Sequence, residues 1–137
     1  MDPEFRVRVI GVVRSSLTAL EGAPRQGSEG APSAVIELEP DVLAALDGIS
    51  VDQDVILLSW FHRARRDVLS THPRNDLARP RAGVFSTRSP DRPNPIGLHR
   101  VRVLAIAAGR LEVAPLEAID GTPIIDIKPV LDDVADG

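Results

Sequence analysis

The segment from Arg88 to Leu98, RSPDRPNPIGL, combines side chains that can bind an anion with a stiff backbone. Three prolines within six residues fix φ and remove three backbone donors, which excludes a helix or a central strand here. Arg88 and Arg92 project from this loop, and a guanidinium group binds carboxylates and phosphates through a planar fork of donors. Gly97 allows close backbone approach. A preformed loop loses little entropy on binding, so the pattern favours a binding site over a purely structural turn.

A second candidate site begins at Asp120–Pro123, DGTP, and continues into a short strand, IIDIKP. The first four residues are typical of a tight turn, and outward-facing N–H groups in such a turn can hold the polar end of a ligand. Alternation in the strand places Asp126 and Lys128 on one face. Ile125 and Ile127 then face the core. The charged pair is either an exposed ion pair worth under ~1 kcal/mol or, since Lys128 is the only lysine, part of a site.

A third candidate is the histidine in WFHR, which ends a strongly apolar segment. His62 lies beside the only tryptophan and could stack on or hydrogen-bond a heterocycle, although this pattern is also typical of a partly buried structural histidine. His72 and His99 share no metal-ligand spacing with it, and cysteine is absent, so we expect no metal site. Nucleotide-binding and protease motifs are missing, and the spacing gives no support to a serine hydrolase.

The charge distribution predicts an anionic partner. The chain has a net charge of −4, but residues 63–102 hold ten arginines against three aspartates, for +7, and both flanking segments are acidic. Fifteen of the sixteen cationic residues are arginine. A genome rich in G and C would explain arginine over lysine, yet it does not explain the clustering. We therefore read residues 63–102 as a candidate surface for nucleic acid.

Length and composition are typical of one globular domain. The 137 residues are 43% hydrophobic with mean hydropathy near zero, which excludes wholesale disorder. No apolar run approaches the ~20 residues of a membrane span, and neither a signal peptide nor a cysteine indicates export, so we expect a cytoplasmic protein. Residues 1–5 resemble a cloning scar, to which we assign no function. Residues 131–137 read as a polar C-terminal tail.

Hydrophobic alternation predicts a mainly β chain. The expected strands are residues 6–13, 34–38, 54–61, 83–87, 101–107, 110–113 and 124–127. A hairpin is expected around Ala108–Gly109, and the only helix candidate is residues 40–46, with proline at its start. Long irregular segments cover residues 15–33 and 63–81, and loops of this length are typical either of binding regions or of disordered segments. Short strands with few helices favour a small barrel or a sandwich.

In these segments the sequence closely resembles the TsaA-like, or TrmO, family of S-adenosylmethionine-dependent tRNA adenine-N6 methyltransferases. The two long matching segments are GVFSTRSPDRPNPIGL, residues 83–98, and DGTPIIDIKP, residues 120–129. WFH at 60–62, PRQ at 24–26 and IGVVRS at 10–15 support them. The resemblance spans about residues 9–130, nearly the whole chain.

The resemblance implies a small single-domain β-barrel over residues 6–130, with at most one or two short helices and not a Rossmann fold. It implies a homodimer with S-adenosylmethionine pockets near the subunit interface. The family methylates N6 of threonylcarbamoyladenosine beside the anticodon of tRNA. Carried over residue by residue, the implied cofactor contacts are Pro24, Arg25, Gln26, Phe61, His62, Arg88, Leu98, Ile119, Asp120, Gly121 and Thr122.

The catalytic candidates are residues on or beside the matched motifs. Asp126 is the first candidate to take the proton of the acceptor nitrogen and His62 the second, while Lys128 and Arg92 would orient the acceptor. The arginine-rich segment would hold tRNA. Val130 stands where the family usually has tyrosine. Two alternatives stay open: methylation of a small molecule, favoured by net acidity and only four aromatic residues, and cofactor binding without catalysis.

Overall fold

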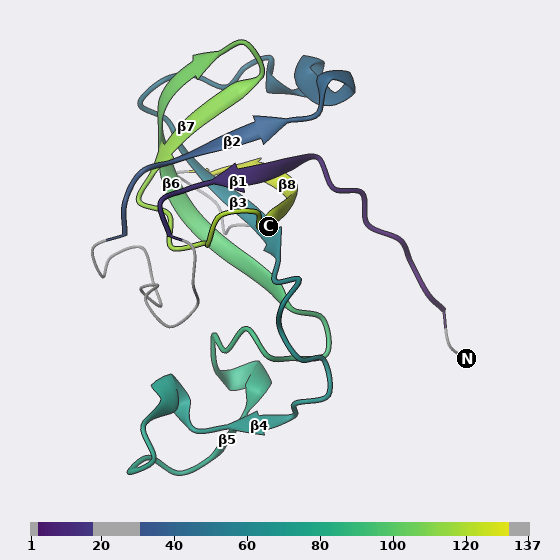
Figure 1. The fold of residues 1–137 in the computed structure, drawn as a ribbon, viewed down its shortest axis with the longest axis vertical. Coiled ribbons are helices and arrows are strands. Elements are labelled where there is room, and N and C mark those ends of the chain that lie inside the picture. Colours follow the sequence, from purple (N-terminus) through teal and green to yellow (C-terminus); the bar gives the residue numbers. More distant parts are fainter. Residues whose placement is uncertain (1–2, 18–30, 132–137) are drawn as a thin grey trace.

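The computed structural model describes residues 3–17 and 31–131 and is built around a closed antiparallel β-barrel (Figure 1). Neighbouring strands follow the order β1-β2-β7-β6-β3-β8, and β8 pairs with β1 to close the ring. This confirms the expected mainly β barrel and decides against a sandwich. The strands are β1 (Gly11–Arg14), β2 (Ala34–Leu38), β3 (Asp54–Trp60), β6 (Ile96–Ala107), β7 (Arg110–Ala114) and β8 (Pro123–Pro129).

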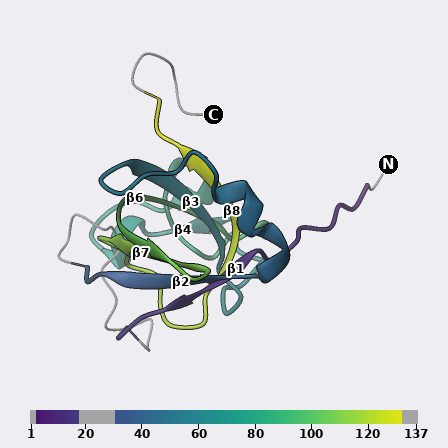
Figure 2. The same ribbon diagram turned by 90° about the horizontal axis from the view of Figure 1, so that it is seen from above.

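The barrel is filled by the alternating inward side chains of its strands, as the sequence pattern predicted. In β6, burial alternates from Gly97 to Val103, and the inward residues meet those of β3 and β7. Leu57, Val101 and Leu111 are fully buried at the centre. Figure 2, seen from above, shows the barrel strands arranged in a ring.

One end of the barrel is covered by η3 (Pro40–Leu46), a 3₁₀ helix at the residues expected to be helical. Its partly buried Val42, Leu43 and Leu46 pack against the core. The β6–β7 hairpin turns at Ala108 and Gly109 as predicted, with φ of 48° and 79°, and the second of these favours glycine. No helix within residues 3–17 and 31–131 is long and apolar enough to cross a bilayer.

A small lobe, residues 61–95, extends from the other end of the barrel between β3 and β6 (Figure 1). It contains a two-stranded sheet of β4 (Ser70–Thr71) and β5 (Ala82–Gly83), with the 3₁₀ turns η4 (Pro73–Asn75) and η5 (Val84–Ser86). The expected strand at 83–87 is therefore wrong beyond residue 83. The Thr87 hydroxyl donates to the Val84 carbonyl and Ser86 donates to that of Gly83, and such bonds favour a turn over a strand.

Three other expectations about strands need correction. β6 begins at Ile96, so the last residues of the proline-rich segment form a strand once the third proline has passed. β1 begins at Gly11 rather than at residue 6. A bulge opposite Leu58 and Ser59 shifts the alternation of β8, so Ile124, not Ile125, is fully buried beside Ile127. A bulge inserts one unpaired residue, which single-strand periodicity does not reveal.

Candidate functional site

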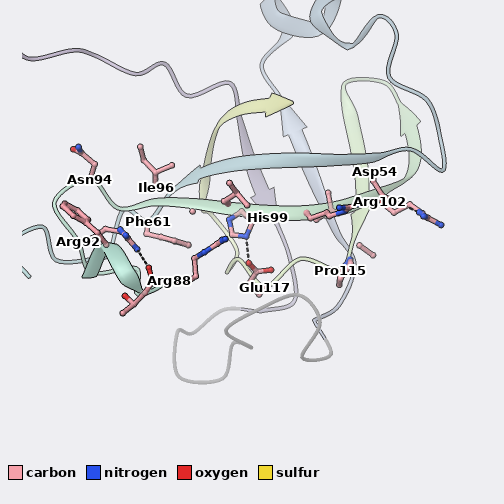
Figure 3. Close-up of a pocket in the computed structure, with 17 residues that line it drawn as sticks. Asp54, Phe61, Arg88, Arg92, Asn94, Ile96, His99, Arg102, Pro115 and Glu117 are labelled. Carbon is pink, nitrogen blue, oxygen red and sulfur yellow. Dashed lines mark hydrogen bonds and ion pairs between the residues drawn. The ribbon is translucent and has the colours of Figure 1, made fainter. Parts of the chain in front are cut away.

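An open groove of about 1000 Å³ lies where the lobe joins the barrel. Its walls come from the proline-rich loop, from the first half of β6, and from the last residue of β7 with the segment after it, residues 114–117. Figure 3 shows side chains from all three segments along it. Four of the sequence candidates line this groove, namely Phe61, Arg88, Arg92 and Leu98. The groove thus brings together residues from Asp54 to Glu117, which lie 63 positions apart in the chain.

At the mouth of the barrel, three polar side chains form a network beneath the groove. The Ser59 hydroxyl and His99 Nε2 are 2.7 Å apart, and His99 Nδ1 pairs with Glu117 Oε1 (Figure 3). Ser59 is 0% exposed and the side chain of His99 is 1% exposed, whereas that of Glu117 keeps 14%. A carboxylate only accepts hydrogen bonds, so His99 Nδ1 carries the proton that it shares with Glu117, and Nε2 faces the Ser59 hydroxyl.

Gly97 lets this network pack against an aromatic ring. A Cβ atom there would lie 2.4 Å from Ser59 Oγ, 2.5 Å from Phe61 Cζ and 2.8 Å from His99 Nε2. The Phe61 ring meets the His99 ring edge to face, with centroids 5.9 Å apart. The close approach expected at Gly97 is confirmed. The groups that approach its backbone are the side chains of Ser59, Phe61 and His99 beneath the groove.

The far end of the groove holds a charged cluster in which Asp54 accepts from two arginines. Arg102 Nε lies 3.0 Å and Arg100 Nη2 3.2 Å from its carboxylate oxygens. The hydrogen bond from Arg102, supported by that from Arg100, lowers the pKa of the Asp54 carboxyl below its usual value. The pKa of Arg102 is raised in turn by Asp54. Asp54 therefore stays a carboxylate whose charge is already compensated.

The proline-rich loop is held in place by arginines. Arg92 donates to the carbonyls of Val84, Thr87 and Ser89 at 2.9–3.0 Å. Arg66 donates to the Pro93 carbonyl and the Asn94 side chain, and it also stacks on Trp60, 5.2 Å from the ring centroid. Much of the arginine cluster therefore stabilises the lobe.

Arg88 differs from Arg92 and Arg66, which hold the loop. Within the described residues, no hydrogen bond or ion pair engages its guanidinium group, and it is exposed. Figure 3 shows it extending from the loop toward the His99–Glu117 pair. It is the arginine of the proline-rich motif that a ligand can reach without breaking an internal bond.

The turn at residues 119–122 does not present the free N–H groups that we expected. The amides of Asp120, Gly121 and Thr122 donate to the carbonyls of Leu17, Val13 and Ile119. Asp120 also accepts from the amide of Ser15, and Ile119 and Thr122 are buried. These bonds close the barrel between β1 and β8, and the turn does not line the groove.

The remaining sequence candidates lie elsewhere. His62 is exposed and does not line the groove. Asp126 and Lys128 form a half-exposed ion pair on β8, 3.4 Å apart. Asp126 and Leu98 both pair with Leu58, so all three share a row across the outer face of β8, β3 and β6. Pro24, Arg25 and Gln26 lie outside the described residues.

The sequence reasoning missed Ser59, Glu117 and the role of His99. Their positions are 40 and 18 residues apart, and no motif spacing connects them. One available signal was a serine and a histidine at inward positions of apolar strands, since buried polar side chains require partners.

The groove offers groups suited to S-adenosylmethionine, namely a guanidinium for its carboxylate, an aromatic ring for its adenine and a carboxylate for its positive charge. Fold and site thus define a small β-barrel with an arginine-lined ligand groove. The family model described as the tRNA-methyltransferase O N-terminal domain matches residues 12–136. The chain belongs to this family, which confirms the resemblance found in the sequence.

Two relatives match this chain over most of their own length. A protein of Methanothermobacter thermautotrophicus is 43% identical, with 97% of this chain and 95% of that protein covered, and is named "Probable S-adenosyl-L-methionine-binding protein". A protein of Archaeoglobus fulgidus, named "S-adenosyl-L-methionine-binding protein", is 40% identical over 89% of this chain and 86% of its own. Both names agree with the cofactor implied by the sequence.

Solved structures match the fold. A crystal structure of TrmO from Pseudomonas aeruginosa aligns with a TM-score of 0.77 and 35% identity over the whole of this chain. This chain spans 61% of that chain's length. The barrel and its lobe therefore correspond to part of a longer protein in that structure.

Proposed function

We propose that this protein is an S-adenosylmethionine-dependent methyltransferase that modifies N6 of threonylcarbamoyladenosine beside the anticodon of tRNA. Membership of the family and the likeness to TrmO structures support this activity. The observation that carries the proposal is the groove in which Arg88, Phe61 and Glu117 converge from three segments. This groove therefore presents a guanidinium, an aromatic ring and a carboxylate, which are groups of the kinds that the cofactor needs.

In this proposal the groove holds the cofactor, which supplies the methyl group when bound. Arg88 binds the carboxylate of its methionine part, and Phe61 with Leu98 contacts its base. Residues 119–122 would contact it from the adjacent turn, as the resemblance implies. Positioning and exclusion of water by the groove then supply most of the acceleration of an in-line displacement.

The acceptor would lie across the outer face of β8, β3 and β6. Asp126 stands two strands from Leu98, roughly 10 Å away at the usual strand spacing, and so borders the groove without lining it. We keep Asp126 as the first candidate for the proton acceptor and His62 as the second. Lys128 and Arg100 both pair with Ile56 and would face the same acceptor. Arg92, by contrast, would orient it only through the loop that it holds.

We further propose a homodimer in which the lobe contacts the partner. Phe85 is 82% exposed at the edge of the groove, and Leu69 and Leu77 of the same lobe are also largely exposed. Large apolar side chains in such exposure are typical of interaction surfaces. A partner over Phe85 would cover the groove and help exclude water from it.

The test is to incubate the protein with S-adenosylmethionine and tRNA that carries threonylcarbamoyladenosine, and to analyse nucleosides by mass spectrometry. We expect a 14-dalton increase on that nucleoside alone, and none on tRNA lacking the modification. Binding should weaken steeply with salt because phosphate contacts release counterions. Methylation of neither tRNA would contradict the proposal.

A second candidate is cofactor binding without catalysis. The relatives from Methanothermobacter thermautotrophicus and Archaeoglobus fulgidus described above are named only as S-adenosyl-L-methionine-binding proteins, one of them as probable. Many arginines of residues 63–102 are also occupied by internal bonds, which leaves fewer for phosphates. Cofactor binding without methyl transfer to tRNA or to small nucleosides would favour this candidate.

A further inference from the structure

Two carboxylates line the groove, and they differ in how their charge is compensated. Asp54 is held by Arg100 and Arg102. Glu117 has no arginine or lysine partner in residues 3–17 and 31–131, and within those residues its side chain is hydrogen-bonded to His99. Glu117 is therefore the groove carboxylate whose negative charge is available to a ligand.

The buried network fixes where that charge lies. Both nitrogens of the His99 ring are hydrogen-bonded, one to Ser59 and the other to Glu117. Only one orientation of the ring makes both of these bonds. The edge-to-face contact with Phe61 closes the other side. Only Oε1 of Glu117 is used by His99, and the side chain remains open to the groove. A charge held in advance costs little reorganisation when a ligand arrives.

The positive charge of the cofactor explains why a carboxylate without an arginine or lysine partner would be useful in this groove. The ammonium and carboxylate of S-adenosylmethionine cancel, which leaves the positive sulfonium, whereas the demethylated product is a neutral thioether. Arg88, Arg92, Arg100 and Arg102 also line the groove and repel a cationic ligand. A groove with this lining needs an uncompensated anion if it is to prefer the donor over the product.

We propose that Glu117 is that anion, a specificity residue that contacts the sulfonium region and favours the cationic donor over the neutral product. His99 and Ser59 are positioning residues that act through Glu117. The proposal rests on the groove being the cofactor site, as proposed above. It adds a role for three residues that belong to no sequence motif of the resemblance.

The proposal is tested by titrating the protein with the donor, S-adenosylmethionine, and with its demethylated product, S-adenosylhomocysteine, in a calorimeter. Glu117→Gln keeps the shape and removes the charge, so we expect it to weaken donor binding by about tenfold and product binding by less than about twofold. Glu117→Asp keeps the charge and should restore part of the preference. Glu112→Gln, on the outward face of β7, is the matched control and should change neither affinity.

The positioning residues need a separate measurement. His99 is one of only three histidines, so its Nδ1 proton can be assigned by NMR. We expect a low-field proton signal that disappears in Glu117→Gln, and a smaller loss of donor preference in Ser59→Ala. If Glu117→Gln fails to fold, the wild-type protein can be titrated with an analogue bearing an amine in place of the methylsulfonium. That cationic analogue should bind more tightly than the thioether.

The outcomes separate this inference from the proposed function. Equal weakening of donor and product by Glu117→Gln overturns the inference, as does loss of turnover with the donor preference intact, which would assign Glu117 to proton transfer. Arg88→Gln removes a contact to the carboxylate that both ligands share and should weaken both alike. If Arg88→Gln weakens neither ligand, the groove is not the cofactor site and the proposed function loses its main support.

Discussion

Buried polar side chains decide the chemistry at the mouth of this barrel. Ser59 and His99 occupy inward positions where the strands elsewhere carry aliphatic residues. Leaving such groups without partners would cost about 1–3 kcal/mol each, so their mutual hydrogen bonds are required for stability. The same bonds hold Glu117 at the edge of the groove, where it can meet a ligand.

Gly97 is the residue on which this packing most depends. Gly97→Ala would place a methyl group within 3 Å of Ser59, Phe61 and His99, and we expect it to destabilise the protein by about 1–3 kcal/mol. Urea denaturation measures the change. Gly83→Ala is the control, because its Cβ would meet nothing closer than 3.9 Å. Equal midpoints for the two variants would contradict the packing described.

Asp54 should make stability depend on pH at the acid end. Its pKa is lowered in the folded state, chiefly by Arg102, so its contribution is present above the unfolded value of about 3.9 and is lost as pH falls through the folded value. Asp54→Asn should cost no more than about 1 kcal/mol at pH 7, because the pair is largely in solvent. Denaturation at pH 7 and pH 3 should show the variant and the wild type converging. A difference of equal size at both pH values would rule out this linkage.

At the scale of elements, the proline-rich loop owes its shape to arginines as much as to proline. Prolines restrict φ, but they also remove donors, so the loop has few backbone bonds of its own. Arginine side chains supply further hydrogen bonds, because Arg92 and Arg66 donate to carbonyl groups of the loop. The backbone amide of Phe61 also donates to the Pro95 carbonyl. The loop is thereby tied to the end of β3, which sets the width of the groove.

Arg92→Ala should loosen this loop without unfolding the barrel. Three charge-assisted hydrogen bonds to Val84, Thr87 and Ser89 would be lost, each worth roughly 1.5–3 kcal/mol in part-buried surroundings. Hydrogen exchange should become at least tenfold faster at residues 84–91 and unchanged in β3 and β7. Arg63→Ala, which removes an exposed arginine of the same lobe, is the control. Unchanged exchange at 84–91 would mean that the prolines alone define the loop.

For the whole molecule, the arrangement of barrel and lobe determines how the groove can close. The groove lies between them, and the exposed Phe85 is one of the residues that line it. A partner subunit that covered Phe85 would bury apolar surface and shield the site together.

Phe85→Ser therefore tests the proposed dimer. We expect the dissociation constant of the dimer to rise at least about tenfold, because removing a central aromatic side chain commonly costs more than 1.4 kcal/mol. Light scattering after size-exclusion chromatography, with cofactor present, measures the mass. Val51→Ser changes an exposed apolar residue elsewhere on the surface and should have no effect. A monomeric wild-type protein would contradict the dimer.

The sequence by itself predicted much of the fold and the family. Alternation placed β2 at residues 34–38 and the hairpin at Ala108–Gly109, because side-chain period and turn chemistry are local properties. The motif around Arg88 indicated a preformed anion-binding loop, and this loop does line the groove. Local patterns could not exclude a strand at 84–86 or foresee the bulge in β8, since hydroxyl bonds and neighbouring strands decide these.

Only the tertiary structure decided which side chains meet. Closure of the barrel and the register of β3 with β6 bring Ser59 beside His99, and the return of the chain after β7 adds Glu117. The same closure occupies the amides of the turn at 119–122 that the sequence had made candidates for ligand binding. Alternation along a strand predicts whether a side chain faces into or out of the barrel. Which side chain it meets across the barrel depends on strand register and barrel closure, and no single segment of the sequence encodes these.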